Sequence, residues 1–375
     1  MMREDTVLGI KVPIVNLGAQ HREIRDEIDE AINRVIESNQ FIMGSEVEKL
    51  EEDLRKYLKV EWAFGCASGT AALELALLAY SIGNGDEVIS TPFTFISTAE
   101  VICLRGAKPV FVDIDADSFN MNPDLIEEAV TEKTKAIIPV HLYGQSADMD
   151  PILDIAQRYD LAVIEDAAQA LGAEYKGVKL GTLGGIGCFS FFPTKNLGCM
   201  GDGGLIAVRD VDLAESVSVM RLHGAAKKYR HPILGTNSRL DEIQAAVILV
   251  KLKYLDTWNE RRAYIASCYN EGLRNLPVEL PKDLGYGRHI YHQYSIRFIG
   301  RDDLSKHLKS RGIQTAVHYP YPLHFQPVFS FLGMNEGSFP ESERAAREVL
   351  CLPIYPEMQD EEVEMVIDGI SSYFG

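Results

Sequence analysis

The sequence lacks any run of about eighteen apolar residues, which is the length that a membrane-spanning helix needs. It also lacks clusters of lysine and arginine, the residues that attract nucleic acid or anionic lipid, and its net charge is −18. We therefore expect neither nucleic acid nor a membrane as a partner. The opening residues, Met1 to Asp5, have no apolar segment typical of a signal peptide, so we expect a cytoplasmic protein.

Cysteine is scarce too, and no two cysteines form a C-x-x-C pair. Such scattered residues are typical of reduced, mostly buried thiols, so we predict neither a disulfide framework nor a metal site. The six are Cys66, Cys103, Cys188, Cys199, Cys268 and Cys351.

Apolar content is ample, because 46% of the 375 residues are hydrophobic, enough for one large domain and a smaller one. Two amphipathic helices are predicted first. One has its apolar positions over residues 24–36 and ends near residues 38–39. The other begins near Ser45, where Ser45 and Glu48 have the spacing of a capping box. Short apolar runs then alternate with helical patterns over residues 63–66, 87–90, 109–112, 136–140, 162–164, 188–191 and 205–208.

Apolar strands that alternate with helices predict an α/β fold with a mostly parallel sheet covered by helices on both faces. Ligands of such sheets bind beyond the carboxyl ends of the strands. The strand pattern stops near Asp256, and a smaller α+β unit follows. We therefore predict a large domain over residues 1–256, including an N-terminal helical arm, and a small C-terminal domain over residues 257–375.

One lysine, Lys195, lies between the aromatic and proline residues of 190–193 and a glycine-rich turn at 201–204. Glycines let a backbone come close to a planar ligand. A lysine among apolar neighbours tends to lose its proton and becomes a nucleophile able to form a Schiff base. An ordinary surface lysine in a turn is the alternative interpretation of this stretch alone.

Three other predicted strand ends carry residues suited to a ligand. Residues 68–70 open a helix whose first N–H groups and Thr70 hydroxyl suit a phosphate, although they also make an ordinary helix cap. Asp166 ends a buried strand, where it can pair with a protonated ring nitrogen or instead cap a following helix. In residues 92–98, Phe95 rather than Phe93 is the aromatic predicted to stack on a planar cofactor.

Phosphate turn, aromatic, aspartate and lysine, in this order, resemble the DegT/DnrJ/StrS-type sugar aminotransferases. These are fold-type I enzymes that depend on pyridoxal 5′-phosphate (PLP), and the resemblance extends from about Val12 to the C-terminus. It implies that Lys195 forms the Schiff base with PLP and that Asp166 pairs with the pyridine nitrogen. It also implies that Phe95 stacks on the ring, with Gln169 on the side of the ring hydroxyl. The residues implied to hold the phosphate are Gly69, Thr70 and Ser190.

The region after the lysine also matches the family. Its G-x-N-x-R motif, residues 235–239, implies that Asn237 reaches the phosphate of a partner subunit's PLP, and therefore a homodimer with shared sites. Arg239 is either a structural arginine or part of the site. Together with Tyr229, in the basic loop before it, Arg239 is a candidate for binding the sugar diphosphate. His141, at another strand end, is expected to be structural.

A stiff, proline-rich loop, residues 317–327, carries histidines and tyrosines that suit hydrogen bonds to a sugar. In the resembled family this loop overhangs the substrate, and its His-Tyr-Pro form recurs in enzymes that act on carbon 3 of nucleotide sugars. The substrate-binding candidates on this loop are His318, Tyr319 and His324.

The predicted function is therefore a PLP-dependent aminotransferase that moves an amino group from L-glutamate to a nucleotide-linked keto sugar, with the 3-keto position favoured. Such a step belongs to the biosynthesis of antibiotic, polysaccharide or lipopolysaccharide sugars. The alternatives are a 4-keto nucleotide sugar as substrate, another PLP enzyme of this fold such as a dehydratase or an aromatic amine synthase, and a non-catalytic regulator. Lys195, where a sugar dehydratase of this family has histidine, argues against dehydration, and the intact Lys195 and Asp166 disfavour a regulator.

Overall fold

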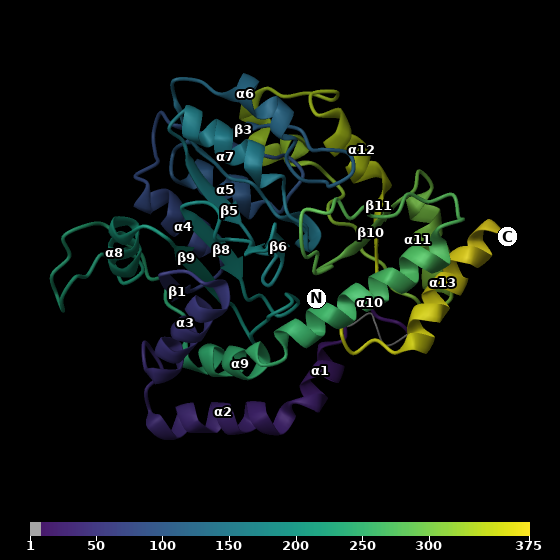
Figure 1. Cartoon of the computed structure of the whole chain (residues 1–375), viewed down its shortest axis with the longest axis horizontal. Helices are drawn as coiled ribbons and strands as arrows, with labels where there is room; N and C mark the ends of the chain where they lie inside the picture. The colour runs from purple at the N-terminus through teal and green to yellow at the C-terminus, as the bar shows by residue number, and fades with distance from the viewer. Residues whose placement is uncertain (1–8) are drawn as a thin grey trace.

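A seven-stranded sheet lies at the centre of the computed structural model, which describes residues 9–375. The prediction about Met1 to Asp5 therefore lies outside the described residues. The seven predicted apolar runs form this sheet in the order β1-β9-β8-β5-β4-β2-β3 (Figure 1). The strands are β1 (Trp62–Cys66), β2 (Glu87–Ser90), β3 (Lys108–Phe111), β4 (Thr134–Ile137), β5 (Ala162–Asp166), β8 (Ile186–Ser190) and β9 (Gly204–Val208).

The sheet is mostly parallel, as predicted. The strands β3, β2, β4, β5 and β8 pair in parallel, whereas β9 pairs antiparallel with both β8 and β1. This reversal places Gly204, the first residue of β9, opposite Ser190 and Cys66, the last residues of β8 and β1. The glycine-rich turn therefore lies at the same edge of the sheet as the carboxyl ends of the other strands.

Helices cover both faces of the sheet, because successive side chains of a strand point to opposite sides. In β8, Cys188 packs into the core under α4, α5 and α8, whereas Phe189 packs into the core under α3, α7 and α9. The predicted α/β fold is therefore confirmed. These helices and a shorter one are α3 (Ser45–Leu58), α4 (Gly69–Ala79), α5 (Ser97–Leu104), α6 (Ile126–Ala129), α7 (Met149–Arg158), α8 (Val211–Met220) and α9 (Glu242–Leu252).

The N-terminal arm consists of α1 (Leu17–Glu23) and α2 (Arg25–Ser38), which lie below α9 in Figure 1. The buried face of α2, formed by Ile28, Ala31 and Val35, packs against the apolar face of α9. Asn39 ends α2 in the left-handed conformation, with φ of 55°, close to the predicted end near residues 38–39.

The predicted capping box of α3 does not form. Gly44 is the N-cap residue, and Ser45 is already helical. Instead, the buried carboxylate of Glu242, at the start of α9, accepts the N–H groups of Gly44, Glu46 and Val47 at 2.6, 2.9 and 3.1 Å. A contact between residues about two hundred positions apart therefore replaces the local cap.

Helix α10 (Leu255–Leu273) joins the sheet to a second core (Figure 1). Its first residue, Leu255, packs under the sheet, whereas Ile265 and Tyr269 pack in the C-terminal core. Val12, near the start of the chain, packs in that same core and bridges Ile313. The division into residues 1–256 and 257–375 stays a proposal, since its boundary falls inside α10 and the N-terminal segment packs across it.

The C-terminal core is built from a two-stranded antiparallel sheet and helices, and short elements complete the fold. Within residues 9–375, no helix is both long and apolar enough to cross a membrane. The remaining elements are β6 (Glu174–Tyr175), β7 (Val178–Lys179), β10 (Tyr294–Arg297), α11 (Arg301–Ser310), α12 (Pro340–Glu348), β11 (Val349–Leu352), α13 (Asp360–Phe374), and the 3₁₀ turns η1 (Pro123–Leu125), η2 (Leu142–Gly144), η3 (Leu323–Phe325) and η4 (Pro327–Leu332).

Replacing Glu242 by alanine should destabilise the protein, because three N–H groups at the start of α3 would lose their acceptor. Losing a cap costs about 0.5–2 kcal/mol. We expect a lower midpoint of thermal or urea unfolding. Asp241→Ala is the matched control, since that neighbouring side chain is exposed and makes no capping hydrogen bond. Equal losses in the two variants would contradict the role of Glu242.

Candidate active site

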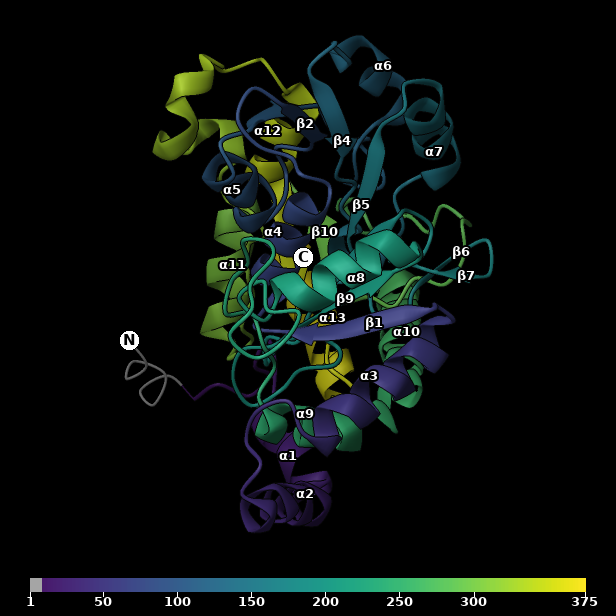
Figure 2. The same ribbon diagram turned by 90° about the vertical axis from the view of Figure 1, so that its left-hand side faces the viewer.

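One cavity opens at the edge of the sheet where β1, β5 and β8 end, and where the chain leaves β2. Its volume is about 430 Å³, which lies in the usual range for small-molecule sites. Figure 2 views the molecule from the side of α8, with α8 in front of the sheet and β1 visible beside it. The sequence-predicted residues that line the cavity are Gly69, Thr70, Phe95, Asp166, Gln169, Ser190, Lys195, His318 and Tyr319.

Lys195 lies in the tight turn after β8, where its N–H donates to the carbonyl of Phe192 at 2.8 Å. The residue keeps partial exposure because it lines the cavity. Burial of its ammonium lowers the pKa of Lys195 to about 8, although the charge of Asp166 opposes the shift. A lysine with this pKa is partly unprotonated near neutral pH, which makes it a nucleophile.

Asp166 ends β5 at the base of the same cavity. Its carboxylate accepts the Thr98 hydroxyl at 2.7 Å and the Ala168 N–H at 3.2 Å. Burial raises the pKa of Asp166, against these two hydrogen bonds and the positive charge of Lys195. No α-helix begins directly after β5, where turns follow Asp166, so its alternative role as a helix cap is not realised among the described residues. A cationic N–H donor in the cavity would stabilise this carboxylate.

The first turn of α4 forms the opposite wall. Ser68 caps the helix, and its hydroxyl accepts the N–H of Ala71 at 3.1 Å. The N–H groups of Gly69 and Thr70 have no helical partners, because they lie in the first turn. A Cβ atom on Gly69 would lie 2.8 Å from that of Ser190, so only glycine lets β8 end this close. The hydroxyls of Thr70 and Ser97 are 2.7 Å apart. These donors suit an anion such as phosphate.

An aromatic wall closes the third side. The centroids of the Phe95 and Tyr319 rings are 6.2 Å apart, and Phe95 keeps 55% of its surface exposed. Gln169 Nε2 donates to the Tyr319 hydroxyl at 3.2 Å, while its Oε1 accepts the Tyr143 N–H at 2.8 Å. The Tyr143 hydroxyl donates to the carbonyl of His318. These bonds fasten the proline-rich loop over the cavity.

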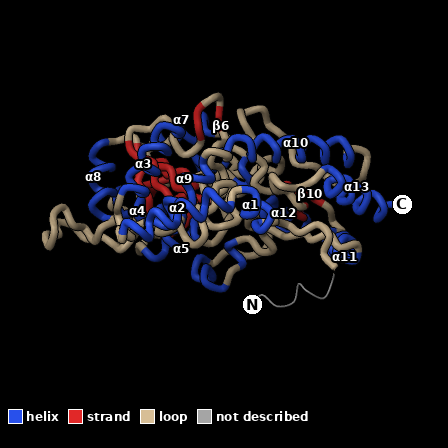
Figure 3. The backbone as a smooth tube through the Cα atoms, turned by 90° about the horizontal axis from the view of Figure 1, so that it is seen from below, coloured by secondary structure: helices blue, strands red, loops and turns tan. Residues whose placement is uncertain are grey.

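Four predicted site residues lie outside this cavity. Asn237 and Tyr229 are exposed on the long loop between α8 and α9, which reaches away from the body of the molecule in Figures 1 and 3. Arg239 is half-buried near the end of that loop. His324 also lies outside the cavity, because η3 turns it inward, where its Nε2 lies 3.2 Å from the carboxylate of Glu343 in α12. His324 therefore packs behind the loop rather than facing a ligand.

Sequence reasoning missed two residues that matter to the site. Thr98, the partner of Asp166, belongs to the stretch 92–98, in which the sequence pattern predicts a site role for Phe95 alone. His292 lines the cavity, and its pKa is lowered well below the usual value, chiefly by burial and further by the charge of Lys195. Its sequence context suggests only a strand. His141 is structural, as expected, since its Nε2 lies 3.0 Å from the buried carboxylate of Glu165.

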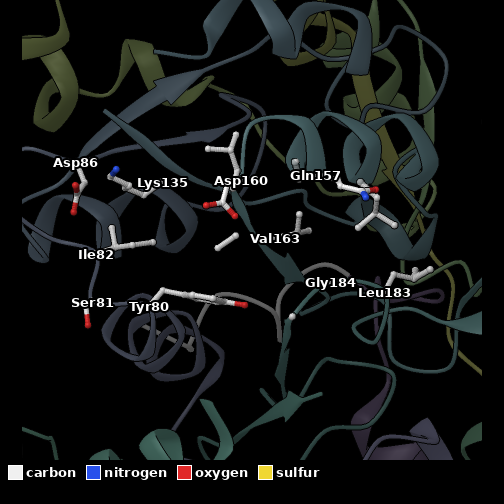
Figure 4. A pocket seen from close by; sticks show the side chains of 15 residues that line it. Tyr80, Ser81, Ile82, Asp86, Lys135, Gln157, Asp160, Val163, Leu183 and Gly184 are labelled. Atoms are coloured by element: carbon white, nitrogen blue, oxygen red, sulfur yellow. The ribbon is translucent and has the colours of Figure 1, made fainter. Parts of the chain in front are cut away.

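A second hollow, of about 700 Å³, lies at the amino ends of β4, β5 and β8 (Figure 4). Of its charged residues, Lys135 and Asp160 are exposed and Asp86 is half-buried, and residues around Val163 and Gly184 form part of its wall. Ligands of doubly wound sheets bind at the other edge. In residues 9–375, no group of three or more histidine, cysteine or acidic side chains is placed to hold a metal ion. The first cavity is therefore the candidate site.

The residues of this cavity fit pyridoxal phosphate. A lysine of low pKa suits its aldehyde, a buried carboxylate that forms no ion pair within residues 9–375 suits its ring nitrogen, and the start of α4 suits its phosphate. The fold and the site thus define a PLP-dependent enzyme. The chain matches the DegT/DnrJ/EryC1/StrS aminotransferase family over residues 22–371, and it belongs to this family.

Three similar proteins support this assignment. The chain is 50% identical to the "Pleiotropic regulatory protein" of Geobacillus stearothermophilus, over 97% of this chain and 99% of the relative. It is 43% identical to the dTDP-3-amino-3,4,6-trideoxy-alpha-D-glucose transaminase of Streptomyces venezuelae, over 97% and 96%. The structure of NtdA from Bacillus subtilis with bound cofactor PMP superposes with a TM-score of 0.90 at 34% identity, covering 99% of this chain and 86% of NtdA. The predicted family, fold, cofactor and class of enzyme are confirmed.

We expect Lys195 to react with an amine-specific reagent at half its maximal rate near pH 8, because only the unprotonated amine is nucleophilic and the pKa of Lys195 is lowered to about 8. Exposed lysines ordinarily have a pKa of about 10.4. The measurement is quantitative mass spectrometry of the modified peptides of full-length, cofactor-free protein, labelled briefly between pH 6 and pH 11. A Lys195 midpoint that coincides with those of exposed lysines would contradict the burial of its ammonium.

Proposed function

We propose that the protein transfers an amino group from L-glutamate to the 3-keto group of a nucleotide-linked sugar. The observation that carries the proposal is the single cavity in which a lysine of low pKa and a buried carboxylate meet. The relative from Streptomyces venezuelae, a transaminase named for a dTDP-linked 3-amino sugar, supports the substrate class.

Lys195 and Asp166 divide the chemistry. When bound, pyridoxal phosphate would supply an aldehyde carbon that takes up the amino group of one substrate and gives it to the other, and a ring that accepts electron density. The Lys195 amine acts first as a general base, which takes the proton from the α-carbon of the amino acid, and then as a general acid, which gives the proton back at the carbon that has received the amino group. Asp166 keeps a proton on the ring nitrogen. Gly69, Thr70 and Ser190 hold the phosphate.

His318 and Tyr319 are proposed to orient the sugar. Burial lowers the pKa of His318, with a further contribution from the charge of Lys195, so its imidazole is neutral and can both donate and accept a hydrogen bond. The Tyr319 hydroxyl accepts from Gln169 and can donate to a ligand. A site that hydrogen-bonds a sugar hydroxyl rejects an analogue that lacks it by roughly 10⁴–10⁵-fold. This pair therefore favours one keto position over another.

We propose that the active unit is a homodimer with shared sites. Asn237 and Arg239 lie outside the cavity of their own chain, on a loop that carries exposed apolar side chains: Tyr229 is 86% exposed and Leu234 is 89% exposed. Apolar groups gathered on a protruding loop favour burial against a partner. In this arrangement the partner's loop brings Asn237 to the cofactor phosphate, and Tyr229 and Arg239 to the sugar diphosphate. The free thiols of all six cysteines suit the proposed cytoplasmic location.

A regulatory role is the second candidate, because the 50% identical relative is named a pleiotropic regulatory protein. A regulator without catalysis has no need of a lysine held at low pKa beside a buried carboxylate. The arrangement of Lys195 and Asp166 therefore favours the enzyme. Measurement of amino transfer separates the two.

Purified protein should transfer ¹⁵N from labelled glutamate to a nucleotide 3-keto hexose, and more slowly or not at all to the 4-keto isomer. Mass spectrometry of the products from a panel of nucleotide keto sugars measures the transfer. Lys195→Ala should remove the visible absorption of the bound cofactor and lower the rate by roughly 10²–10⁴-fold through lost proton transfer. His318→Ala should slow the sugar half-reaction and leave the glutamate half-reaction nearly unchanged.

Each outcome decides a separate part of the proposal. No transfer from glutamate to any sugar would favour the regulator, and turnover of 4-keto sugars alone would overturn the 3-keto assignment. Equal losses in both half-reactions of His318→Ala would place His318 among the residues that hold the cofactor. Visible absorption that survives in Lys195→Ala would refute the role of Lys195.

Mixing inactive Lys195→Ala subunits with inactive Asn237→Ala subunits should restore part of the activity. In a mixed dimer with shared sites, one site contains both mutations and the other contains neither. The recovered activity should rise with the fraction of mixed dimers, measured by native mass spectrometry. If each chain builds its site alone, the mixture will stay inactive.

A further inference from the structure

The residue that follows the candidate lysine, Asn196, is the centre of a buried hydrogen-bond network. Its side-chain N–H groups donate to Asn259 Oδ1 at 2.7 Å and to the carbonyl of Ile290 at 3.4 Å, and its Oδ1 lies 2.9 Å from Nδ1 of His292. Asn196, His292 and Asn259 are 7%, 5% and 1% exposed. The turn that carries Lys195 is therefore tied to α10 and to the segment before β10.

The direction of these bonds fixes the tautomer of His292. Because the amide N–H groups of Asn196 are already donated to Asn259 and Ile290, its Oδ1 acts as the acceptor toward His292. Nδ1 of His292 must then carry the hydrogen, which leaves Nε2 without one in a residue that lines the cavity.

Helix α10 holds both ends of the network. Asn259 Nδ2 donates to the carbonyl of Leu171 at 3.3 Å, in the turns that follow β5. One turn further along the helix, Nη1 of the buried Arg262 donates to the carbonyl of His292 at 3.4 Å and to that of Ile354 at 2.8 Å. His292 is thus held at two points: Arg262 binds its main-chain carbonyl, and Asn196 binds its imidazole.

We propose that His292 and Asn259 are positioning residues for Lys195: together they hold the Asn196 side chain, and with it the peptide that carries the reactive amine, in the cavity wall. The inference rests on the proposed role of Lys195. A buried network in which every group is paired rigidifies its surroundings, and the loss of one member leaves a buried polar atom unpaired. The unpaired Asn196 oxygen would then draw the turn, and Lys195 with it, toward water.

Hydration of the turn changes the protonation of Lys195, because burial is the largest cause of its lowered pKa. The other titratable side chains that face the cavity are Asp166 from β5, Asp202 from the glycine-rich turn, and His318 and Tyr319 from the proline-rich loop. None of these forms a hydrogen bond with Asn196, and His292 itself is neutral because its pKa is lowered well below the usual value, chiefly by burial. A variant at His292 therefore alters the lysine through the network rather than by removing a charge.

Two variants of His292 separate this role from simple packing. In His292→Asn the amide N–H can replace the donor at Nδ1, whereas His292→Gln places its amide near Nε2 and loses that donor. We expect the labelling midpoint of Lys195 in full-length, cofactor-free protein to rise by about one pH unit or more in His292→Gln, toward the ordinary lysine pKa of about 10.4. It should stay within about 0.3 pH units of the wild type in His292→Asn. Asn196→Ala should raise the midpoint as His292→Gln does, and the double variant should add little.

His289→Gln is the matched control. His289 is also buried, and its Nδ1 accepts the Tyr291 N–H at 3.0 Å, but it does not line the cavity. This variant should lower the melting temperature and leave the labelling midpoint of Lys195 unchanged. The proposal is overturned if His292→Gln or Asn196→Ala, whichever folds, keeps the wild-type midpoint, or if His292→Asn shifts as far as His292→Gln. Labelling needs neither cofactor nor turnover, so it decides this inference even if Lys195→Ala keeps the visible absorption.

Discussion

The burial of two opposite charges in one cavity is the constraint on which the rest of the site depends. Asp166 is the last residue of β5 and Lys195 follows the neighbouring strand β8, and burial raises the pKa of the carboxyl group while it lowers that of the amine. Each group is thereby moved toward its neutral form. A ligand that offers a cationic N–H to the carboxylate and a carbonyl to the amine satisfies both groups, which explains why this cavity suits pyridoxal phosphate.

Strand β5 ends in two carboxylates with different surroundings: Glu165 is bound within the fold, and Asp166 lines the cavity. The side chain of Glu165 accepts the N–H groups of Gly181, Leu183 and Gly184, each at 2.7 Å, and lies 3.0 Å from His141. It thereby fixes the loop that leads into β8, the strand that ends just before the lysine turn. Asp166, the next residue, points to the other side of the sheet and into the cavity. Alternation along the strand thus separates an acid that stabilises the fold from an acid that lines the cavity.

Contacts between distant parts of the chain hold the lysine turn and the proline-rich loop in place around the cavity. Helix α10 reaches from the core under the sheet to the C-terminal core, and it holds the lysine turn through Asn259 and Asn196. The proline-rich loop is fastened through His318 to Tyr143 and through Tyr319 to Gln169. The proline-rich loop and the cavity wall around Gln169 are therefore joined by hydrogen bonds.

The sequence by itself determined the seven strands and predicted a mostly parallel sheet, and it placed Gly69, Phe95, Asp166 and Lys195 near predicted strand ends. Apolar periodicity is a property of residues close in the chain, and it is enough to locate the strands. Once the strands are located, the rule that ligands lie at their carboxyl ends points to the residues that follow them. Only the tertiary structure decided that Glu242 rather than Ser45 caps α3, that His324 turns away from the cavity, and that His292 lies in its wall. Each of these depends on a partner or a fold position far away in sequence, or on the direction of one short turn. Local patterns carry no signal for such contacts, because the free energy that selects them comes from burial in the folded chain.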